Sequence, residues 1–297
     1  MNLDESDVSG LLSMQEVIPA MERALANFSS GKVVQPMRVM LPVAEHQGFL
    51  GLMPAYTGAA LGTKLVAFYP HNTNVPTHHA TILLFKPETG EPLVTMDGRL
   101  ITEVRTAAVS AVATDHLARS DASVLAIIGS GVQARSHLEA LKLVREFREV
   151  RVWSPNRAPA FAREHGVRAA ASAEEAVRGA DVVVTATTSP TPVLSGEWVS
   201  SGAHINAVGA PRPDWRELDD ELLRRARVYV DSREAAMKES GDVIAAGDIF
   251  AEIGEVAAGS QPGRRSAEDV TLFKSLGLAV EDVATAELVY RKALDSA

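Results

Sequence analysis

The sequence predicts an α/β protein of two domains, because two stretches of the chain differ in the order and spacing of their predicted strands and helices. Between residues 37 and 96, five short strand-like runs are separated by polar turns, a spacing typical of an antiparallel or mixed sheet. From Ser123 onward, strand-like and helix-like segments alternate, which is typical of a parallel sheet with right-handed crossovers. With 297 residues, the chain is long enough to bury two hydrophobic cores.

The first domain begins with a helix and continues with strands. Ser13 is the predicted N-cap of this helix, Glu16 stands at the capping-box position, and apolar residues follow at helical spacing as far as Phe28. The turn Pro87-Glu-Thr-Gly90 predicts a hairpin between the last two strands. A helix over 102–118 is expected to lead into the second domain. The predicted strands are 37–41, 49–53, 62–68, 81–86 and 92–96.

The second domain is predicted to contain the parallel sheet. The tail of the chain breaks the alternation, because Leu272 and Phe273 open an apolar stretch that predicts a helix packing on the first domain. We therefore assign residues 1–116 and 271–297 to the first domain and residues 117–270 to the second. The predicted strands are 124–128, 150–153, 181–186, 204–208 and 227–230, with helices over 133–146, 157–165 and 172–178.

The turn after the first of these strands carries the strongest functional signal. Gly129, Gly131 and Ala134 fit the pattern G-x-G-x-x-A between an apolar strand and an amphipathic segment. The first glycine permits a sharp turn, the second lets the backbone approach a pyrophosphate, and the small third residue lets helix and strand pack closely. The second domain is therefore predicted to be a Rossmann-type domain that binds a dinucleotide, with Val132 and Gln133 at the start of its helix.

The end of the next strand indicates which dinucleotide is bound. NAD-binding folds usually place a carboxylate there, on the ribose 2′-hydroxyl, but this strand runs into Ser154-Pro-Asn-Arg157 with no acid. Ser154, Asn156 and Arg157 are suited to a 2′-phosphate, which a carboxylate would repel. Arg157 is equally compatible with a solvated residue at a helix start. We predict NADPH as the cofactor and leave NADH open.

Composition argues against several other functions. The net charge of −9 disfavours binding to nucleic acid or to an anionic membrane, and no apolar stretch reaches the length that spans a bilayer. The chain has no cysteine, which removes disulfides and thiolate chemistry and is compatible with a reducing cytoplasm. An acidic start (Asp4, Glu5 and Asp7) has the wrong charge for a signal peptide. We therefore expect a cytoplasmic protein. Histidines and carboxylates show no metal-ligand spacing, so we also expect no metal ion.

Several blocks of the chain resemble the ornithine cyclodeaminase/mu-crystallin family, and its mu-crystallin branch more than its cyclodeaminases. The blocks lie in the same order over nearly the whole chain. This resemblance implies a substrate-binding and dimerisation domain built from both chain ends, an NAD(P)-binding Rossmann domain between them, and a homodimer joined through the first domain's sheet. The blocks include Gly51-Leu-Met-Pro-Ala-Tyr56, Thr63-Lys-Leu-Val66, Arg105-Thr-Ala-Ala-Val-Ser-Ala111, His204-Ile-Asn-Ala-Val-Gly209, Lys238-Glu-Ser-Gly-Asp-Val243 and Phe273-Lys-Ser-Leu-Gly277.

Members of this family bind a substrate carboxylate with two arginines and a lysine, and matching the blocks places these on Arg38, Lys64 and Arg105. Arginine supplies a fork of donors to a carboxylate and lysine a point charge. Each residue, taken alone, is also compatible with a solvated or salt-bridged side chain. The resemblance implies that these three form the catalytic site and that Arg212 also contacts the substrate. Lys64 is the candidate proton donor if its pKa is depressed.

The same matching implies further contacts to the cofactor. His78 is equally compatible with an ordinary surface or core histidine. The implied cofactor-binding residues outside the glycine turn and the Ser154 segment are Thr77, His78, Arg105, Thr106, Ala186, Thr187, Thr188, Val208 and Ser275.

One departure from the family pattern narrows the reaction. Cyclodeaminases and related amino-acid dehydrogenases carry an aspartate where this chain has Pro211, which cannot take or give a proton. We expect Asp214 to cap a helix over 215–223, although it could take over part of the missing acid's role. The resemblance thus implies an NADPH-dependent ketimine reductase that converts Δ1-piperideine-2-carboxylate or Δ1-pyrroline-2-carboxylate to pipecolate or proline. The alternatives are an ornithine cyclodeaminase, an NAD-dependent amino-acid dehydrogenase and a protein that binds a small ligand such as thyroid hormone.

Overall fold

The computed structural model describes residues 1–209 and 211–296, and the chain forms two compact units. The first comprises Met1–Arg105 and Gly277–Ala297, and the second Thr106–Leu276. One boundary falls inside helix α3 (Arg99–Leu117), earlier than the division expected after residue 116. The later part of α3 belongs to the second unit because its polar side chains bond there: Ser110 with His137, and Thr114 with Asn206.

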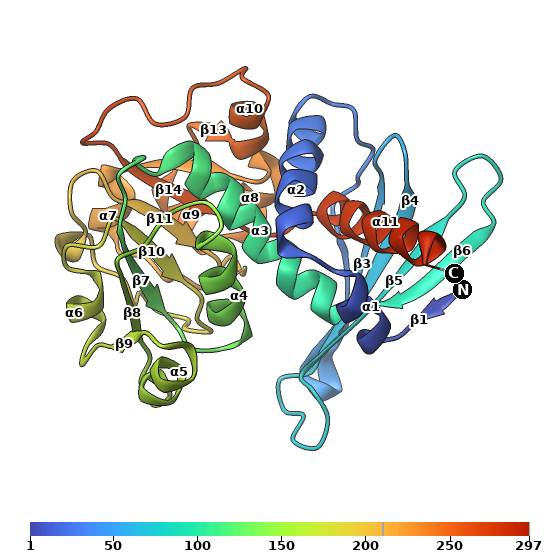
Figure 1. Ribbon diagram of the computed structural model, residues 1–297, viewed down its shortest axis with the longest axis horizontal. Helices are drawn as coiled ribbons and strands as arrows, with labels where there is room; N and C mark the ends of the chain where they lie inside the picture. Colours follow the sequence, from blue (N-terminus) through green and yellow to red (C-terminus); the bar gives the residue numbers. More distant parts are fainter. Residues whose placement is uncertain (210, 297) are drawn as a thin grey trace. The chain divides into compact units, whose positions relative to one another are not determined.

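The first unit contains a six-stranded sheet in the order β1-β6-β5-β4-β3-β2 (Figure 1). β1 runs parallel to β6, and every other neighbouring pair is antiparallel, which confirms the predicted mixed sheet. The predicted turn joins β5 to β6, with Gly90 at a φ of 76°. The strands are β1 (Asn2–Leu3), β2 (Val39–Val43), β3 (Gly48–Tyr56), β4 (Leu61–Phe68), β5 (His78–Phe85) and β6 (Pro92–Asp97), with a short 3-10 helix, η1 (Ala44–His46), between β2 and β3.

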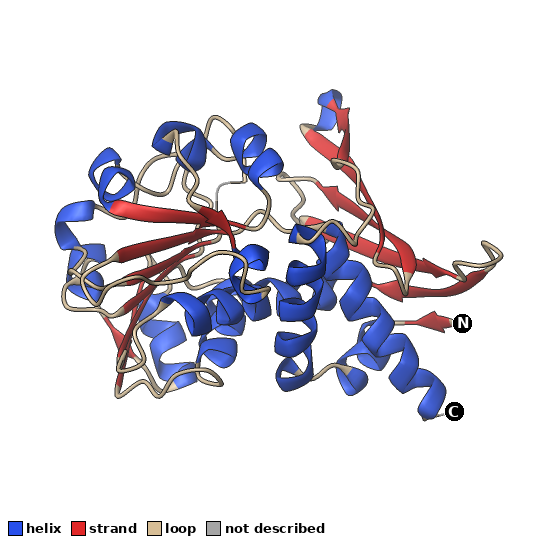
Figure 2. Cartoon of the chain, turned by 90° about the horizontal axis from the view of Figure 1, so that it is seen from above, coloured by secondary structure: helices blue, strands red, loops and turns tan. Residues whose placement is uncertain are grey.

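Two long helices, α2 (Met14–Ser29) and α11 (Ala279–Asp295), pack side by side, and α11 lies against β3, β4 and β5 (Figures 1 and 2). Because side chains alternate along a strand, one face of the sheet carries Met53, Ile82 and Leu84 into this core, and all three are buried. The other face carries leucines that remain partly exposed. They include Leu50, Leu52, Leu65 and Leu83.

The helix starts of this unit differ from the prediction in one detail. Ser13 is the N-cap of α2, but its side chain makes no capping hydrogen bond. The capping box belongs instead to the preceding helix, α1 (Glu5–Leu11), where Asp4 and Asp7 each accept a hydrogen bond from the other's backbone N–H.

The second unit contains an eight-stranded sheet in the order β13-β12-β14-β11-β10-β7-β8-β9, and all its pairs are parallel, as predicted. From β7 the chain continues to β8 and β9 on one side and then returns to β10 on the other. Ligands of such sheets bind outside the carboxyl ends of the strands, at this switch in direction. The strands are β7 (Val124–Ile128), β8 (Glu149–Trp153), β9 (Arg168–Ala169), β10 (Val182–Thr185), β11 (His204–Ala207), β12 (Ala226–Val230), β13 (Ala251–Glu252) and β14 (Val270–Lys274).

β14 corrects the prediction for the tail of the chain. Residues that we expected in a helix form a buried strand between β11 and β12, and α11 begins only at Ala279. A short, continuous apolar run fits a buried strand and a buried helix equally well, so periodicity could not separate them. β14 therefore places residues 271–276 in the second unit.

Short helices connect the parallel strands. No helix among the described residues is long and apolar enough to cross a membrane. The helices are α4 (Val132–Leu141), α5 (Ala158–His165), α6 (Ala173–Val177), α7 (Asp220–Arg225), α8 (Arg233–Glu239), α9 (Gly241–Ala246) and α10 (Ile253–Ala257), with a 3-10 helix, η2 (Gly196–Trp198).

Candidate active site

Lys64 lies on β4, and its side chain enters the buried side of the first unit's sheet. Only 2% of the residue is exposed. Its Nζ lies 2.7 Å from Oδ2 of Asp282, a fully buried residue in the first turn of α11. It also donates to the hydroxyl of Thr102 on α3, at 3.4 Å. The strand alternation therefore points the ammonium group at two helices of its own unit.

Arg105, also on α3, faces the same two acids at the start of α11. Its Nη1 donates to Oε2 of Glu281 at 2.6 Å, and its Nε donates to Oδ1 of Asp282 at 2.9 Å. Both carboxylates are fully buried, and Arg105 is 5% exposed. Asp282 therefore joins Lys64 to Arg105, one carboxylate oxygen to each cation.

Arg38 completes the predicted trio from the segment before β2. Its Nη2 donates to the carbonyl oxygen of Gly277 at 2.9 Å. Gly277 has a φ of 80°, and a Cβ there would lie 2.5 Å from Nη1 of Arg105. The backbone at Gly277 thus passes against both arginines, and only glycine fits this position. The structure brings Arg38, Lys64 and Arg105 together in the first unit.

Burial and charge shift the pKa values in this cluster. Burial lowers the pKa of Lys64 from its ordinary 10.5 to about 8; the neighbouring Asp282 opposes the shift, while Arg105 and Arg38 add to it. Burial alone would raise the pKa of Asp282, but Arg105 and Lys64 outweigh it and hold this pKa below its usual value. Asp282 is therefore ionised at neutral pH, and Lys64 can gain or lose a proton near pH 8.

The cluster is suited to holding an anion. Lys64 and Arg105 pair with the buried carboxylates of Glu281 and Asp282, and the half-buried Arg38 lies on the Gly277 carbonyl, where its charge acts on Lys64. An arginine pair with a lysine matches the two oxygens of a carboxylate.

Sequence reasoning missed the acidic half of this cluster. It placed the cations but did not name Glu281 and Asp282, which hold them, or Thr102. A signal was available, because these two acids interrupt an apolar stretch over 278–283. Carboxylates in such a stretch are buried only when they are paired.

The glycine turn of the second unit has the geometry of a phosphate site. Gly129 has a φ of 123°, and a Cβ there would lie 2.4 Å from the carbonyl oxygen of Ala186. A Cβ on Gly131 would meet open space, and Gly131 caps α4 with no side-chain hydrogen bond. The buried Oε1 of Gln133 has no hydrogen-bond partner among the described residues. The backbone N–H groups at this open helix start are the donors that fit a dinucleotide pyrophosphate, whereas Oε1 of Gln133 is an acceptor and is suited to a hydroxyl or amide donor.

The other predicted cofactor residues of this unit lie along one edge of the sheet. In each case the residue directly follows the carboxyl end of a parallel strand, at or beside the switch in strand order. Thr188 is exposed beside Thr187, and the amide of Ser275 donates to the carbonyl of Ala207 at 3.0 Å. The residues that directly follow a strand are Gly129 after β7, Ser154 after β8, Ala186 after β10, Val208 after β11 and Ser275 after β14.

Two hydroxyl groups meet at the ends of β7 and β8. Oγ of Ser130, inside the glycine turn, lies 2.8 Å from Oγ of Ser154, which also accepts the backbone N–H of Arg157 at 3.2 Å. Asn156 and Arg157 are exposed, and Arg157 is the N-cap of α5. The sequence did not single out Ser130, which adds a hydroxyl at the position where a ribose 2′-substituent is expected.

Three further predicted cofactor residues are Thr77, His78 and Thr106. Thr77 and His78 are near the start of β5 in the first unit, where the Thr77 hydroxyl lies 3.1 Å from Nδ1 of His78. Thr106 is buried on α3, next to Arg105. The structure gives no contact that assigns them a function, and their roles stay predictions.

The segment around Pro211 corrects one expectation. Asp214 caps no helix: it is exposed and lies 3.4 Å from Nε of Arg212, and Asp219 caps α7, which begins at Asp220. Arg212 is itself exposed and stacks on the ring of Trp215 at 4.8 Å. The helix starts later than predicted because Asp219 accepts the N–H of Leu222, which Asp214 cannot reach. Arg212 belongs to the second unit, and its role in substrate binding stays a prediction.

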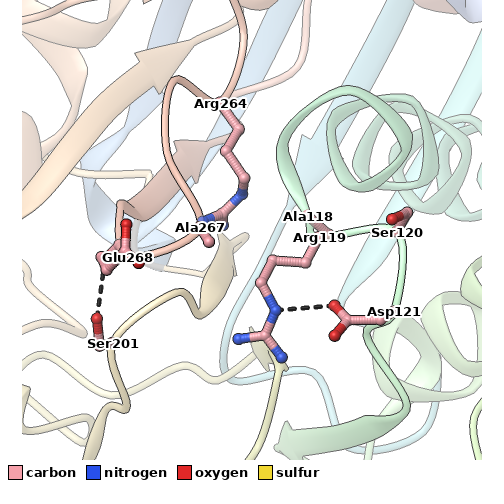
Figure 3. Close-up of a pocket in the computed structure, with 8 residues that line it drawn as sticks. All are labelled: Ala118, Arg119, Ser120, Asp121, Ser201, Arg264, Ala267 and Glu268. Atoms are coloured by element: carbon pink, nitrogen blue, oxygen red, sulfur yellow. Dashed lines mark hydrogen bonds and ion pairs between the residues drawn. The ribbon is translucent and has the colours of Figure 1, made fainter.

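A hollow of about 630 Å³ lies elsewhere in the second unit (Figure 3). It is lined by residues that precede β7, β11 and β14, so it lies at the amino ends of the strands. Its arginines are already engaged: Arg119 pairs with Asp121 and Asp181, and Arg264 donates to backbone carbonyls. These contacts make it a structural feature of the edge opposite the predicted cofactor site.

Comparison with known proteins agrees with this arrangement. The model of the ornithine cyclodeaminase/mu-crystallin family matches residues 1–297. The chain is 56% identical over 292 residues to ketimine reductase mu-crystallin of Mus musculus, covering 94% of this chain and 93% of that protein. It resembles Delta(1)-pyrroline-2-carboxylate reductase of Thermococcus litoralis, solved with NADH and L-proline, with a TM-score of 0.94, 42% identity and coverage of 100% and 98%. An archaeal alanine dehydrogenase dimer with bound NAD gives a TM-score of 0.94, 40% identity and coverage of 100% and 96%. The chain belongs to the ornithine cyclodeaminase/mu-crystallin family, as its sequence blocks predicted.

Proposed function

We propose that this protein is an NADPH-dependent ketimine reductase. The chain is an oxidoreductase acting on C=N bonds, in keeping with its relatives, and the proposal adds the substrate and the cofactor. The substrate is a cyclic ketimine with a 2-carboxylate, Δ1-piperideine-2-carboxylate or Δ1-pyrroline-2-carboxylate, and the product is pipecolate or proline. The observation that carries the proposal is the pair Lys64 and Arg105, buried on Asp282, together with Arg38 on the Gly277 carbonyl against which Arg105 also lies.

In this proposal the cations hold the substrate carboxylate. Arg38 and Arg105 lie against the same glycine backbone, so their guanidinium groups are fixed before the substrate arrives. Fixing the carboxylate also fixes which face of the C=N bond is presented for reduction. Such alignment supplies a large part of the rate when little proton chemistry is needed.

Lys64 is the group that handles the proton. Reduction of a C=N bond requires a proton on nitrogen, and a lysine with a pKa of about 8 can supply one near neutral pH. Asp282 keeps the ammonium group in place through its 2.7 Å contact. When bound, the reduced nicotinamide supplies the hydride for the carbon.

NADPH is preferred over NADH in this proposal. The residues after β7 and β8 offer hydroxyls, an amide and a positive charge, with no carboxylate among them; they are Ser130, Ser154, Asn156 and Arg157. A doubly charged phosphate gains from such donors, whereas a bare ribose hydroxyl would need an acceptor.

The protein is proposed to form a homodimer through the open face of the first unit's sheet. This face is apolar because it carries the leucine side chains of Leu50, Leu52, Leu65 and Leu83, and the edge strand β2 adds exposed Leu41. The alanine dehydrogenase relative is a dimer. Light scattering should give twice the mass of the chain, and Leu52→Lys should lower that mass.

The test is NADPH oxidation with Δ1-piperideine-2-carboxylate, compared with Δ1-piperideine, which has the same ring and no carboxylate. The proposal predicts many turnovers with the first imine and a kcat/KM for the second that is lower by on the order of 10²-fold or more. Lys64→Met should reduce this preference, because Arg38 and Arg105 remain to hold the carboxylate, while the protein still binds NADPH.

Two results would refute the proposal. One is equal kcat/KM for the two imines, which would remove the carboxylate from recognition. The other is consumption of NADPH only in proportion to the protein present, which would favour a binding protein over an enzyme.

A further inference from the structure

Three charged side chains are buried beneath the carboxyl edge of the second unit's sheet. Lys274 is the last residue of β14, Asp242 lies in the first turn of α9, and Glu217 lies between β11 and α7. All three are fully buried. None of them belongs to the carboxylate-binding cluster of the first unit, and the proposed reaction gives none of them a role. We call them the buried bracket.

Lys274 and Asp242 form the first half of this bracket. Nζ of Lys274 donates to the carbonyl oxygen of Gly209 and lies 3.1 Å from Oδ2 of Asp242. The other carboxylate oxygen of Asp242 accepts the backbone N–H groups of Glu217 and Leu218, at 3.0 and 3.1 Å. The pair therefore ties the loop after β11 to the segment that carries Glu217.

Glu217 forms the second half. Its Oε2 accepts the hydroxyl of Thr185 at 2.8 Å, and its Oε1 accepts the amide and the hydroxyl of Thr187 at 2.8 and 2.7 Å. A Cβ on Gly209 would lie 2.2 Å from the carbonyl oxygen of Thr187 and 2.5 Å from Oε1 of Glu217. The loops after β10 and β11 are thus locked against each other with no spare room.

The order of the strands shows which half of a dinucleotide these loops would meet. The ribose end of the site, with Ser154, lies after β8, and the phosphate turn, with Gly129, lies after β7. Continuing across the switch point, β10 and β11 come next. A dinucleotide bound across this point places its other half, which carries the nicotinamide, over the loops after β10 and β11.

Burying charged side chains to hold two loops together costs desolvation free energy. Packed apolar side chains would give as much stability, whereas a charged network with every partner in place fixes one geometry. We propose that Lys274, Asp242 and Glu217 are positioning residues that fix the loops at Thr187 and Gly209 to receive the nicotinamide half of the cofactor. This inference rests on the proposed use of NADPH.

The test compares the whole cofactor with one half of it. Glu217→Gln keeps the shape of the side chain but exchanges one acceptor for a donor. We expect the Kd of NADPH to rise about tenfold, because the loop at Thr187 loses one good hydrogen bond to residue 217. The Kd of adenosine 2′,5′-bisphosphate, which reaches only the side of β8 and β7, should stay within about twofold. Both are measured by calorimetry on the full-length protein.

Lys274→Met is the second variant, and Lys274→Arg keeps the charge in case the methionine variant does not fold. Tyr229→Phe is the matched control, because it removes one buried hydrogen bond to the Gly263 carbonyl in the same unit. It should lower the Tm to a similar degree as Glu217→Gln and leave both Kd values unchanged.

Selective loss of NADPH affinity supports the positioning role, even if the wild-type protein reduces no ketimine. Equal changes for NADPH and for the half-cofactor, or no change for either, would overturn it and leave the bracket purely structural. A wild-type protein that binds neither ligand would overturn the cofactor proposal on which the inference rests, and the inference with it.

Discussion

Nζ of Lys64 lies 2.7 Å from Oδ2 of Asp282, and both side chains are buried between a strand and a helix that are more than two hundred residues apart in sequence. The same aspartate holds Nε of Arg105 through its second oxygen, at 2.9 Å. One carboxylate thus holds two of the three cations in the proposed substrate site and opposes the lowering of the Lys64 pKa by burial.

The first prediction concerns pH. Burial lowers the pKa of Lys64 to about 8, so its positive charge is present below that pH and is lost above it. Affinity for cyclopentanecarboxylate, a ring acid that stays ionised throughout, should therefore fall as the pH rises through about 8. Because Asp282 raises the pKa of Lys64, Asp282→Asn should move this fall to lower pH. The measurement is the inhibition constant as a function of pH.

Glu287→Gln is the control for that experiment. Glu287 lies farther along α11, where its carboxylate pairs with Arg291. Its profile should keep the wild-type midpoint, whereas Lys64→Met should remove the transition altogether. A transition that survives in Lys64→Met would show that another group titrates.

The second prediction concerns Arg38. Removing its guanidinium in Arg38→Ala takes away a fixed donor to the carboxylate, so kcat/KM should fall by on the order of 10²-fold, roughly 2.7 kcal/mol. The Kd of NADPH should not change. Arg38→Lys should recover part of the loss, since it keeps the charge but not the fork. Unaltered kinetics in a folded Arg38→Ala protein would exclude this residue from the site.

The third prediction concerns the choice of cofactor. Wild-type protein should have a lower KM for NADPH than for NADH, because the segment Ser154-Pro-Asn-Arg157 contains no carboxylate. Arg157→Glu should raise the KM for NADPH by about tenfold or more and leave that for NADH nearly unchanged. Arg163→Glu, an exposed charge reversal at the other end of α5, should change neither value. A wild-type KM for NADH equal to or below that for NADPH would refute this preference.

The fourth prediction separates two glycines of one turn. Gly129→Ala combines a φ of 123° with a clash against the Ala186 carbonyl, so it should destabilise the protein by more than about 1 kcal/mol. Gly131→Ala meets open space and an extended backbone, and should cost less than about 0.5 kcal/mol. Both should weaken NADPH binding, the second by obstructing the phosphate. Urea unfolding and calorimetry give the two readings, and normal NADPH binding by Gly131→Ala would contradict the phosphate site.

Most of the fold could be predicted from sequence because apolar residues recur at clear intervals along its strands and helices. β7 matches the predicted 124–128 residue for residue, since a buried parallel strand is a short apolar run bounded by a glycine turn. β14 could not be predicted, because its apolar run continues into a helix and its place between β11 and β12 depends on pairing with strands distant in sequence.

The site could be predicted only in part. Motif blocks identified the cations Arg38, Lys64 and Arg105, and the structure brings them together. Glu281 and Asp282, the partners of Lys64 and Arg105, interrupt an apolar stretch far away along the chain; this indicates that they are paired, but only the packing of α11 against β4 shows with which cations. Lys274 and Asp242 stood inside the family-like blocks, but a sequence does not show that two such residues form a buried pair.

We predict that this chain reduces a preformed ketimine and does not make one from ornithine. The sequence resemblance implies that Pro211 stands where cyclodeaminases carry an acid, and removing ammonia from ornithine requires a proton acceptor near the α-nitrogen. The most direct measurement follows two reactions in one preparation: NADPH oxidation with Δ1-piperideine-2-carboxylate, and ammonia release from ornithine with NAD or NADP. We predict sustained NADPH oxidation and no ammonia above that of a sample without protein. Ammonia release as fast as imine reduction would contradict the account.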